Sequence, residues 1–472
     1  MPFSLSNREM RPTPGVTRVP YSYSVQVAPK TGVRRPAVIN PGWLVWATWI
    51  ATTVVATVWV VGYGRRFPYS DDWRLVDVMV GDQPMTLEWL WSQHDAHRLV
   101  VVRLVMTYLT RWAGGDFRAT LVFNLVLLSV IAAAAILVLR RVRGRTKLVD
   151  AFFPIVLLSL GVDGLNYGFQ MQFVCTSVAA IGVLLVMVRH GLTVPPGGLW
   201  LSAGLMLVLL GQGGPGLAML LPLCVWLMAA SIVLRRTRSV QGTLLITATA
   251  LLLSGMGAYF IGFEAHSGSN AQSVSALATA IGRAASASGG DRMSDLWPWS
   301  GIAAVLLFAV TTVVLLRALR ADRQRAIALT IFGAAVLLLV LAIAWGRGGM
   351  EWFKGLEHHY TPLLLPFLCW MYIVWDRYGG QVRAWAGVTL AGLAILIYAW
   401  GVADAQELGP YVAAEADAFN RDLCAGVPAG KLAARHTHLL YYVDDEPGRQ
   451  LVANGIETLR KHRFGPFGCG GN

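Results

Sequence analysis

The chain is short of charge, above all of negative charge. Only 14% of its 472 residues are charged, and 39 lysines and arginines stand against 26 acidic residues. Soluble domains carry charge on about 25% of their residues. Hydrophobic residues make up 55% of the sequence, the mean hydropathy is +0.54, and apolar runs long enough to cross a bilayer recur. We therefore predict an all-α, polytopic membrane protein with the lipid bilayer as its surroundings.

Several motifs of soluble enzymes are also absent. The sequence has no P-loop, no Cys/His array with zinc-finger spacing and no Gly-x-Ser-x-Gly elbow. It has no sizeable inner domain of the kind that a cytoplasmic nucleotide-sugar transferase needs. The net charge of +13 would suit nucleic acid, but the basic residues cluster at the ends of apolar runs, where they fix membrane topology. We therefore expect no nucleic-acid partner.

Cysteine is scarce, with five residues in all. Cys175, Cys224 and Cys369 lie in apolar runs and are predicted to be small core residues. Cys424 and Cys469 lie in the polar C-terminal region. Thiols of exported proteins often form disulfides. The sequence therefore allows either a disulfide between Cys424 and Cys469 or two free thiols.

The apolar runs predict about eleven transmembrane segments. The third, fifth and tenth are shorter than the ~20 residues of an upright spanning helix. The fifth and sixth flank "GQGGPG" and form either one broken helix or a re-entrant hairpin. The segments are 43–62, 119–139, 149–161, 172–188, 199–210, 216–233, 243–262, 300–316, 326–345, 361–375 and 384–401.

Charge and composition predict the topology. Residues 1–42 are polar and basic and are expected to form a disordered cytoplasmic N-terminus. The run from Trp43 is too long for a signal-peptide core and lacks a small-residue cleavage site, so we expect it to stay as an anchor. With this orientation the inner segments hold more than half of the Lys and Arg. The abundance of Ala, Val, Arg and Trp is typical of a GC-rich bacterial source, so the expected location is the bacterial plasma (inner) membrane.

The same topology predicts the domain plan. Residues 43–401 form the transmembrane domain, and its first extracytoplasmic loop is 63–118. Residues 402–472 form a small extracytoplasmic C-terminal domain of short helices, with strands as an alternative. Apolar groupings in the first loop predict two amphipathic helices at the membrane surface. A further span there would place "RRVRGR" outside, against the charge rule.

The first loop carries the main candidate site. Asp71 and Asp72 are neighbours in "SDDW", and neighbouring carboxylates disfavour joint ionisation. One of them is therefore a candidate general base, or the pair is a candidate site for a divalent metal, Mg²⁺ or Mn²⁺. No other cofactor is expected. The alternative is a pair that is only solvated or that caps the next helix. Trp73 would stack on a sugar or anchor the loop at the interface.

His94, His97 and Arg98 follow in the same loop. On a helix their spacing would place all three side chains on one face. Arg98 would then meet a phosphate, and a neutral histidine would bind a metal or move a proton. An interfacial helix with no site role is the alternative.

Three later stretches supply further candidates. The sequence "GVDGLNYGFQMQF" has polar residues at a helix end that would bind sugar hydroxyls or satisfy one another, and Gln212 is similar. A late outer loop would hold the donor phosphate, or serve only as an interfacial loop anchored by aromatic residues. The loop that begins at Glu264 and His266 is a candidate gate. The residues of the first two stretches are Asp163, Asn166, Gln170 and Gln172, and Arg347, Lys354, Glu357, His358, His359 and Tyr360.

This arrangement resembles the GT-C superfamily of integral-membrane glycosyltransferases. Those enzymes have an acidic motif just after the first membrane helix, where "SDDW" (Ser70–Trp73) stands here. The resemblance implies a GT-C-like fold and a polyprenyl-phosphate sugar donor. It also implies hexosyl or pentosyl transfer to a glycan, lipid or protein acceptor of the cell envelope, with Asp71 and Asp72 as catalytic residues. The C-terminal region is small beside those of many members, and no subfamily is matched.

Other functional classes stay open. A transporter or flippase of lipid-linked saccharide would need charges near the middle of the membrane, whereas the charges here concentrate in outer loops and at helix ends. A polysaccharide polymerase or ligase would use outer arginines but needs no aspartate pair. A non-catalytic assembly partner is a third alternative. No internal repeat supports an inverted-repeat transporter.

Overall fold

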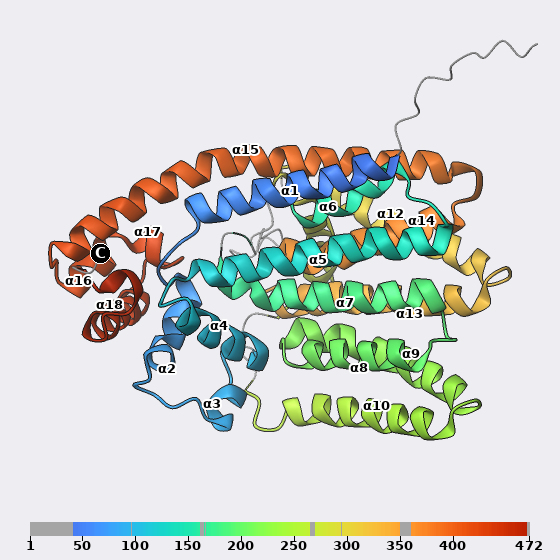
Figure 1. The fold of residues 1–472 in the computed structure, drawn as a ribbon, viewed down its shortest axis with the longest axis horizontal. Coiled ribbons are helices and arrows are strands. Elements are labelled where there is room, and N and C mark those ends of the chain that lie inside the picture. The colour runs from blue at the N-terminus through green and yellow to red at the C-terminus, as the bar shows by residue number, and fades with distance from the viewer. Residues whose placement is uncertain are drawn as a thin grey trace, which may run out of the picture. The chain divides into compact units, whose positions relative to one another are not determined.

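A computed structural model describes residues 41–95, 97–160, 165, 167–264, 270–293, 295–349 and 360–469. These residues belong to one compact unit, and every element among them is helical (Figure 1). The prediction of an all-α chain is therefore confirmed. Most of the predicted N-terminal tail, residues 1–40, lies outside the described residues.

Eight helices in the described part of the chain are long and apolar enough to cross a membrane. Apolar runs of this length form helices because lipid offers no partners to the polar groups of the backbone. The chain is thus a multi-pass membrane protein. The eight helices are α1 (Pro41–Tyr63), α5 (Arg118–Arg143), α7 (Met171–His190), α9 (Gly214–Arg235), α10 (Ser239–Tyr259), α12 (Trp299–Ala318), α13 (Arg323–Arg347) and α15 (Arg383–Cys424).

The other three predicted segments form shorter or less apolar helices. They are α6 (Phe152–Leu157), α8 (Pro196–Leu210) and α14 (Thr361–Tyr378). With 15 residues, α8 is about 22 Å long, less than the ~30 Å of a bilayer core. Around "GQGGPG" the chain turns sharply, and α8 packs against α9 as a separate helix. The two are therefore a hairpin, not one broken helix.

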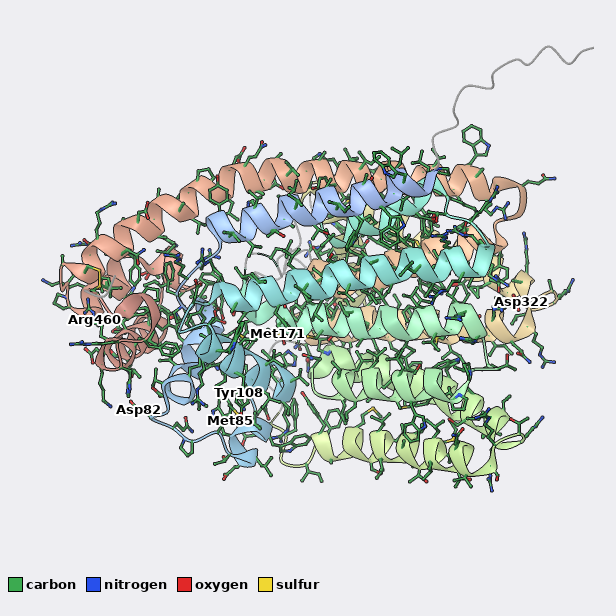
Figure 2. All side chains as sticks on the ribbon, viewed as in Figure 1. Asp82, Met85, Tyr108, Met171, Asp322 and Arg460 are labelled. Carbon is green, nitrogen blue, oxygen red and sulfur yellow. A yellow bond between two sulfur atoms is a disulfide. The ribbon has the colours of Figure 1, made fainter. Side chains whose placement is uncertain are left out.

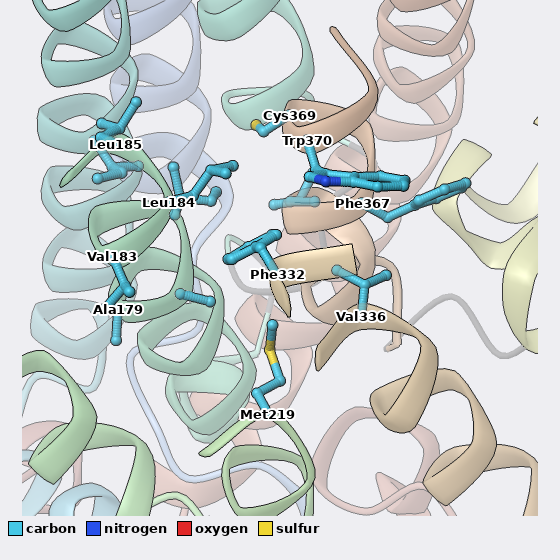
Figure 3. Close-up of a cluster of buried hydrophobic side chains, with 14 of the residues drawn as sticks. Ala179, Val183, Leu184, Leu185, Met219, Phe332, Val336, Phe367, Cys369 and Trp370 are labelled. Atoms are coloured by element: carbon cyan, nitrogen blue, oxygen red, sulfur yellow. The ribbon is translucent and has the colours of Figure 1, made fainter. Parts of the chain in front are cut away.

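The middle of the bundle is filled by apolar side chains from several helices. Figure 3 shows Val183 of α7, Met219 of α9, Phe332 of α13 and Trp370 of α14 in one cluster. The indole N–H of Trp370 donates to the carbonyl of Leu329 at 2.9 Å, so its one polar group is satisfied inside the core. Three free cysteines are buried as predicted, namely Cys175, Cys224 and Cys369.

The first loop packs onto one end of the bundle, which we call the loop end. Its elements are the 3₁₀ helix η1 (Ser70–Leu75), α2 (Val76–Val80), α3 (Leu87–Trp91) and α4 (Val100–Trp112). In α4, Val102 and Met106 are buried, while Leu104, Tyr108 and Trp112 are exposed at a spacing of four residues. An exposed apolar stripe of this kind suits a helix that lies in the membrane interface. The first of the two predicted surface helices is instead broken into short pieces.

The C-terminal residues share a core with this loop. Helix α15 runs through the predicted boundary at residue 402, and α16 (Ala429–Arg435), α17 (Thr437–Leu440) and α18 (Glu446–Lys461) follow it. In Figure 1 the red helix α18 lies near α2, and α18 contacts both α2 and η1. Cys424 and Cys469 form a disulfide, which settles the choice left by the sequence. No strand is found among the described residues of this region.

The other end of the bundle, the basic end, is held by an ion-pair network. The buried carboxylate of Asp150 accepts hydrogen bonds from Arg143 at 2.5 Å and from the hydroxyl of Tyr372 at 2.8 Å. Asp376 on α14 binds Arg143 and Lys147. Figure 2 shows Asp322 at this same end. Because charges there are removed from water, their mutual pairing joins α5, α14 and the turn that precedes α6.

Replacing Asp150 by Asn should destabilise the bundle by about 3 kcal/mol, because the buried guanidinium of Arg143 loses one of its two carboxylates. Denaturant unfolding in detergent micelles measures this loss. The matched control is Asp444→Asn, which breaks an exposed pair with Arg449 and should cost less than about 1 kcal/mol. Equal unfolding midpoints for the two variants would refute the structural role of Asp150.

Candidate functional site

Asp71 and Asp72 lie in a tight turn just after α1, at the loop end. Ser70 has φ of +54°, a left-handed conformation that residues with side chains rarely adopt. Oδ2 of Asp72 accepts a hydrogen bond from the backbone N–H of Tyr69 at 3.1 Å. The second aspartate therefore caps its own 3₁₀ helix, as the alternative reading of the pair allowed.

Asp71 is the more accessible of the two carboxylates, with 23% of its side chain exposed. The hydroxyl of Tyr167 donates to Oδ2 at 3.1 Å, and Nε2 of His94 lies 3.5 Å from Oδ1. Burial acts to raise the pKa of Asp71, but His94, Arg74 and Tyr167 together lower it below its ordinary value. Asp71 is therefore ionised at neutral pH.

Asp72 is held in the opposite state. The residue is 3% exposed, and burial raises the pKa of Asp72 to about 8. The negative charge of Asp71 raises it further, while the hydrogen bond from Tyr69 opposes the shift. The pair thus carries one negative charge at neutral pH, on Asp71, and a proton on Asp72.

His94 and His97 do not share a helix face, so that prediction is wrong. Their backbones form a two-way bridge, with N–H···O distances of 2.6 Å from His94 and 2.9 Å from His97. The ring of His94 packs on Phe169 with centroids 5.0 Å apart. Burial, together with the positive charge of Arg347, lowers the pKa of His97 to about 4, so His97 is neutral.

Arg98 and Trp73 are engaged by the protein itself. The buried guanidinium of Arg98 donates to the carbonyls of Trp91, Tyr259 and Ile261 at 2.6, 3.0 and 2.9 Å. It satisfies the C-terminal end of α10, where Nη2 also donates to the carbonyl of Gly262 at 3.2 Å, so four of its five N–H groups are engaged by backbone carbonyls. Trp73 is 2% exposed, so its ring faces are not available to stack on a sugar. We assign both residues to the structure of the site.

Buried glutamines surround the same end of the bundle. Gln170, Gln172 and Gln212 are buried, and their side-chain oxygens accept no hydrogen bond among the described residues. Buried polar atoms are normally satisfied by protein, water or ligand. These side chains are therefore suited by their chemistry to bind hydroxyl groups, and the sugar-binding role stays a prediction.

The later loops are described in part. Tyr360 packs against Phe173 with ring centroids 5.4 Å apart, and Arg347 lies close enough to shift the pKa of His97. The backbone N–H of Glu264 donates to the side chain of Gln93, which joins the predicted gate to the His94 turn. Seven predicted residues lie outside the described ranges: Asp163, Asn166, His266, Lys354, Glu357, His358 and His359.

The sequence did not reveal three tyrosines of this site. Tyr167 bonds to Asp71, and the charge of Asp71 contributes to the raised pKa values of Tyr441 and Tyr442. Burial is the larger cause, and it raises the pKa of Tyr442 to about 12. Tyr167 lies within the polar stretch "GVDGLNYGFQMQF", but only the folded structure shows that its hydroxyl contacts Asp71.

A set of possible metal ligands lies at the site, and it differs from the predicted Asp71–Asp72 pair. Asp71, His94 and Asp95 offer ligand atoms that all lie within 4.8 Å of one another. Nε2 of His94 is buried and makes no hydrogen bond of normal length, which leaves it available as a ligand. Asp95 also pairs with Arg74 at 2.8 Å. A mixed imidazole and carboxylate set suits Mn²⁺ better than Mg²⁺.

Comparison with protein-family models, curated proteins and solved structures gives no match for the chain. The site is therefore characterised by its geometry and charge.

Asp72→Asn should change how stability depends on pH. Asp72 holds its proton more tightly in the folded chain, with a pKa of about 8 against 3.8 for an ordinary Asp, so folding stability falls as pH rises between these values. Asparagine has no such proton to lose. We expect the variant to unfold at a higher temperature than wild type above pH 8, with the difference vanishing near pH 4.

The measurement is thermal unfolding in detergent from pH 4 to pH 9. The control, Asp82→Asn, removes a carboxylate whose pKa is lowered by Lys461 and His462, so it should not gain stability at high pH. Parallel curves for wild type and Asp72→Asn would contradict the raised pKa.

Proposed function

We propose that the chain is a GT-C-type membrane glycosyltransferase. It transfers a sugar from a polyprenyl-phosphate donor to a glycan, lipid or protein acceptor of the cell envelope. The loop end and the C-terminus face the extracytoplasmic side of a bacterial plasma membrane, and the chain crosses that membrane about eleven times. Arginines at the basic end, such as Arg143 and Arg325, support this orientation through the positive-inside rule. The Cys424–Cys469 disulfide supports an oxidising compartment for the loop end.

One observation carries the proposal: an ionised carboxylate lies at the loop end of the bundle, which also holds buried polar groups without hydrogen-bond partners among the described residues. Asp71 is charged and partly exposed, while Asp72 next to it is protonated. Gln170 and Gln212, at the same end, have side-chain oxygens that no described residue satisfies. A base at the same end of the bundle as hydroxyl-binding groups is what the proposed sugar transfer from a lipid carrier requires.

In the proposed reaction Asp71 accepts the proton of the attacking acceptor hydroxyl. The acceptor oxygen bonds to the anomeric carbon as the bond from that carbon to the phosphate oxygen breaks. The electron pair of the broken bond leaves with the polyprenyl phosphate. Attack from the face opposite the leaving group inverts the anomeric centre. Tyr167 orients Asp71 through its hydrogen bond at 3.1 Å, and Arg347 supplies positive charge near His97.

A divalent cation held by Asp71, His94 and Asp95 would neutralise the departing phosphate. These side chains suit the ion by type and spacing. Asp71 would then divide its two oxygens between the cation and the acceptor proton.

Asp71→Asn should lower sugar transfer by about 10²–10⁴-fold, because the amide cannot accept the acceptor proton. The assay offers the purified chain in lipid vesicles a panel of polyprenyl-phosphate sugars and mixed envelope acceptors, and detects products by mass spectrometry. The matched control is Asp82→Asn in the same loop, whose exposed carboxylate pairs with Lys461 and His462. It should retain wild-type turnover.

Undiminished transfer by Asp71→Asn would rule out Asp71 as the base. Movement of the lipid-linked sugar across the vesicle membrane without transfer would identify a flippase instead. Joining of whole oligosaccharides that survives Asp71→Asn would identify a polymerase or ligase.

Metal binding gives a test that does not depend on turnover. We expect Mn²⁺ to bind wild type as one site per chain, seen by electron paramagnetic resonance, and His94→Gln to weaken that binding by about 10–100-fold or more because one ligand is lost. Asp82→Asn should bind as wild type does. Equal Mn²⁺ affinity in wild type and His94→Gln would exclude this ligand set.

A further inference from the structure

A second cluster of functional groups lies at the basic end, away from the Asp71 turn. Side chains from four helices line a cavity of ≈ 510 Å³ there. The helices are α5, α7, α13 and α14, whose other ends point toward the loop end. The lining residues are Arg141, Val142, Arg189, His190, Arg325 and Arg377.

The cavity carries an excess of positive charge. Arg377 donates to Asp322 at 2.7 Å, and Arg325 lies 3.5 Å from the same carboxylate, so one acid faces two arginines. The side chains of Arg141 and Arg189 have no hydrogen-bond or ion-pair partner among the described residues. Asp376 is no counter-ion for them, because it is already bound to Arg143 and Lys147. Four guanidinium groups thus line the cavity, and among the described residues Asp322 pairs with two of them.

An exposed apolar stripe leads along α5 to this cavity. Val126, Val130 and Leu137 are exposed, and their spacing places them on the helix face that Arg141 continues. The stripe is open to acyl chains, and its end at Arg141 lies where the helix leaves the apolar layer. An apolar track that ends in arginines matches a molecule with hydrocarbon tails and an anionic head.

We propose that this cavity binds a phosphate-bearing anion, supplied by the membrane as the headgroup of an anionic phospholipid. One guanidinium group can donate two parallel hydrogen bonds to two oxygens of a phosphate. Arginines from several helices can therefore surround a phosphate headgroup. The acyl chains lie on the α5 stripe. Because the cavity is at the opposite end of the bundle from Asp71, the proposed lipid binding does not depend on the proposed sugar transfer.

The test is native mass spectrometry of the delipidated full chain in detergent. The protein is titrated with dioleoyl phosphatidylglycerol, with cardiolipin and, as the uncharged comparison, with dioleoyl phosphatidylcholine. The cavity variant is Arg141→Gln with Arg189→Gln. The control, Arg236→Gln with Arg320→Gln, removes the same charge from exposed arginines of the basic end that do not line the cavity.

We expect the first anionic lipid to bind wild type and the control alike, and the cavity variant about 25-fold more weakly, since each arginine contributes a factor of about five. Phosphatidylcholine should bind all three weakly. Equal weakening in the control would overturn the proposal in favour of general surface charge, as would equal binding of the three lipids by wild type. Displacement of the lipid by millimolar inorganic phosphate would overturn the choice of a lipid and identify a soluble phosphate as the ligand.

Discussion

The candidate site depends on one long-range contact, between Trp73 and the C-terminal helices. The indole N–H of Trp73 donates to the carbonyl of Leu440 at 2.9 Å, across 367 residues of sequence. Its ring lies so close to Gly455 that a methyl group there would stand 2.5 Å from it. Because Trp73 follows Asp72 directly, this contact fixes the turn and removes Asp72 from water. Asp71 stays at the edge of the buried region, so two identical side chains acquire different charges.

Arginines that donate to backbone carbonyls give the surrounding loop its shape. Arg98, Arg103 and Arg111 interrupt an apolar run in the sequence, which is typical of an interfacial helix. In the structure they donate to backbone carbonyls instead: Arg103 to Ser92 at 2.9 Å, and Arg111 to Met79 at 2.8 Å. The carbonyls at the ends of short helices would otherwise lack partners, and a buried guanidinium has several donors to offer them. Each group satisfies the other, so the short helices of the first loop are held against one another and against α4.

Local properties of the sequence were enough to predict the bundle and the position of the acidic turn. The length of an apolar run and the charge at its ends are set by the bilayer, so α1, α5, α9 and α13 follow from their own residues. The His94 turn could not be predicted in this way. Spacing favoured a helix, but Arg98 is bonded to Tyr259, 161 residues away, and the backbones of His94 and His97 bond to each other. Tyr167 and Tyr442 were missed for the same reason, since only the folded chain brings them to Asp71.

The positions of the buried charged residues are relevant to the choice between the proposed enzyme and a transporter. Among the described residues the buried aspartates and arginines are Asp72, Arg98 and Arg103 at the loop end and Asp150 at the basic end. Between the two ends the bundle is filled by apolar side chains such as Met219, Phe332 and Trp370 (Figure 3). A saccharide that crossed there would leave its hydroxyl groups without partners, at a cost of roughly 1–3 kcal/mol for each. A polyprenyl chain meets no such barrier, because it stays in the lipid while its phosphate remains at the membrane surface. The apolar middle of the bundle is therefore compatible with the proposed reaction at one face of the membrane, which needs no saccharide to pass between the helices.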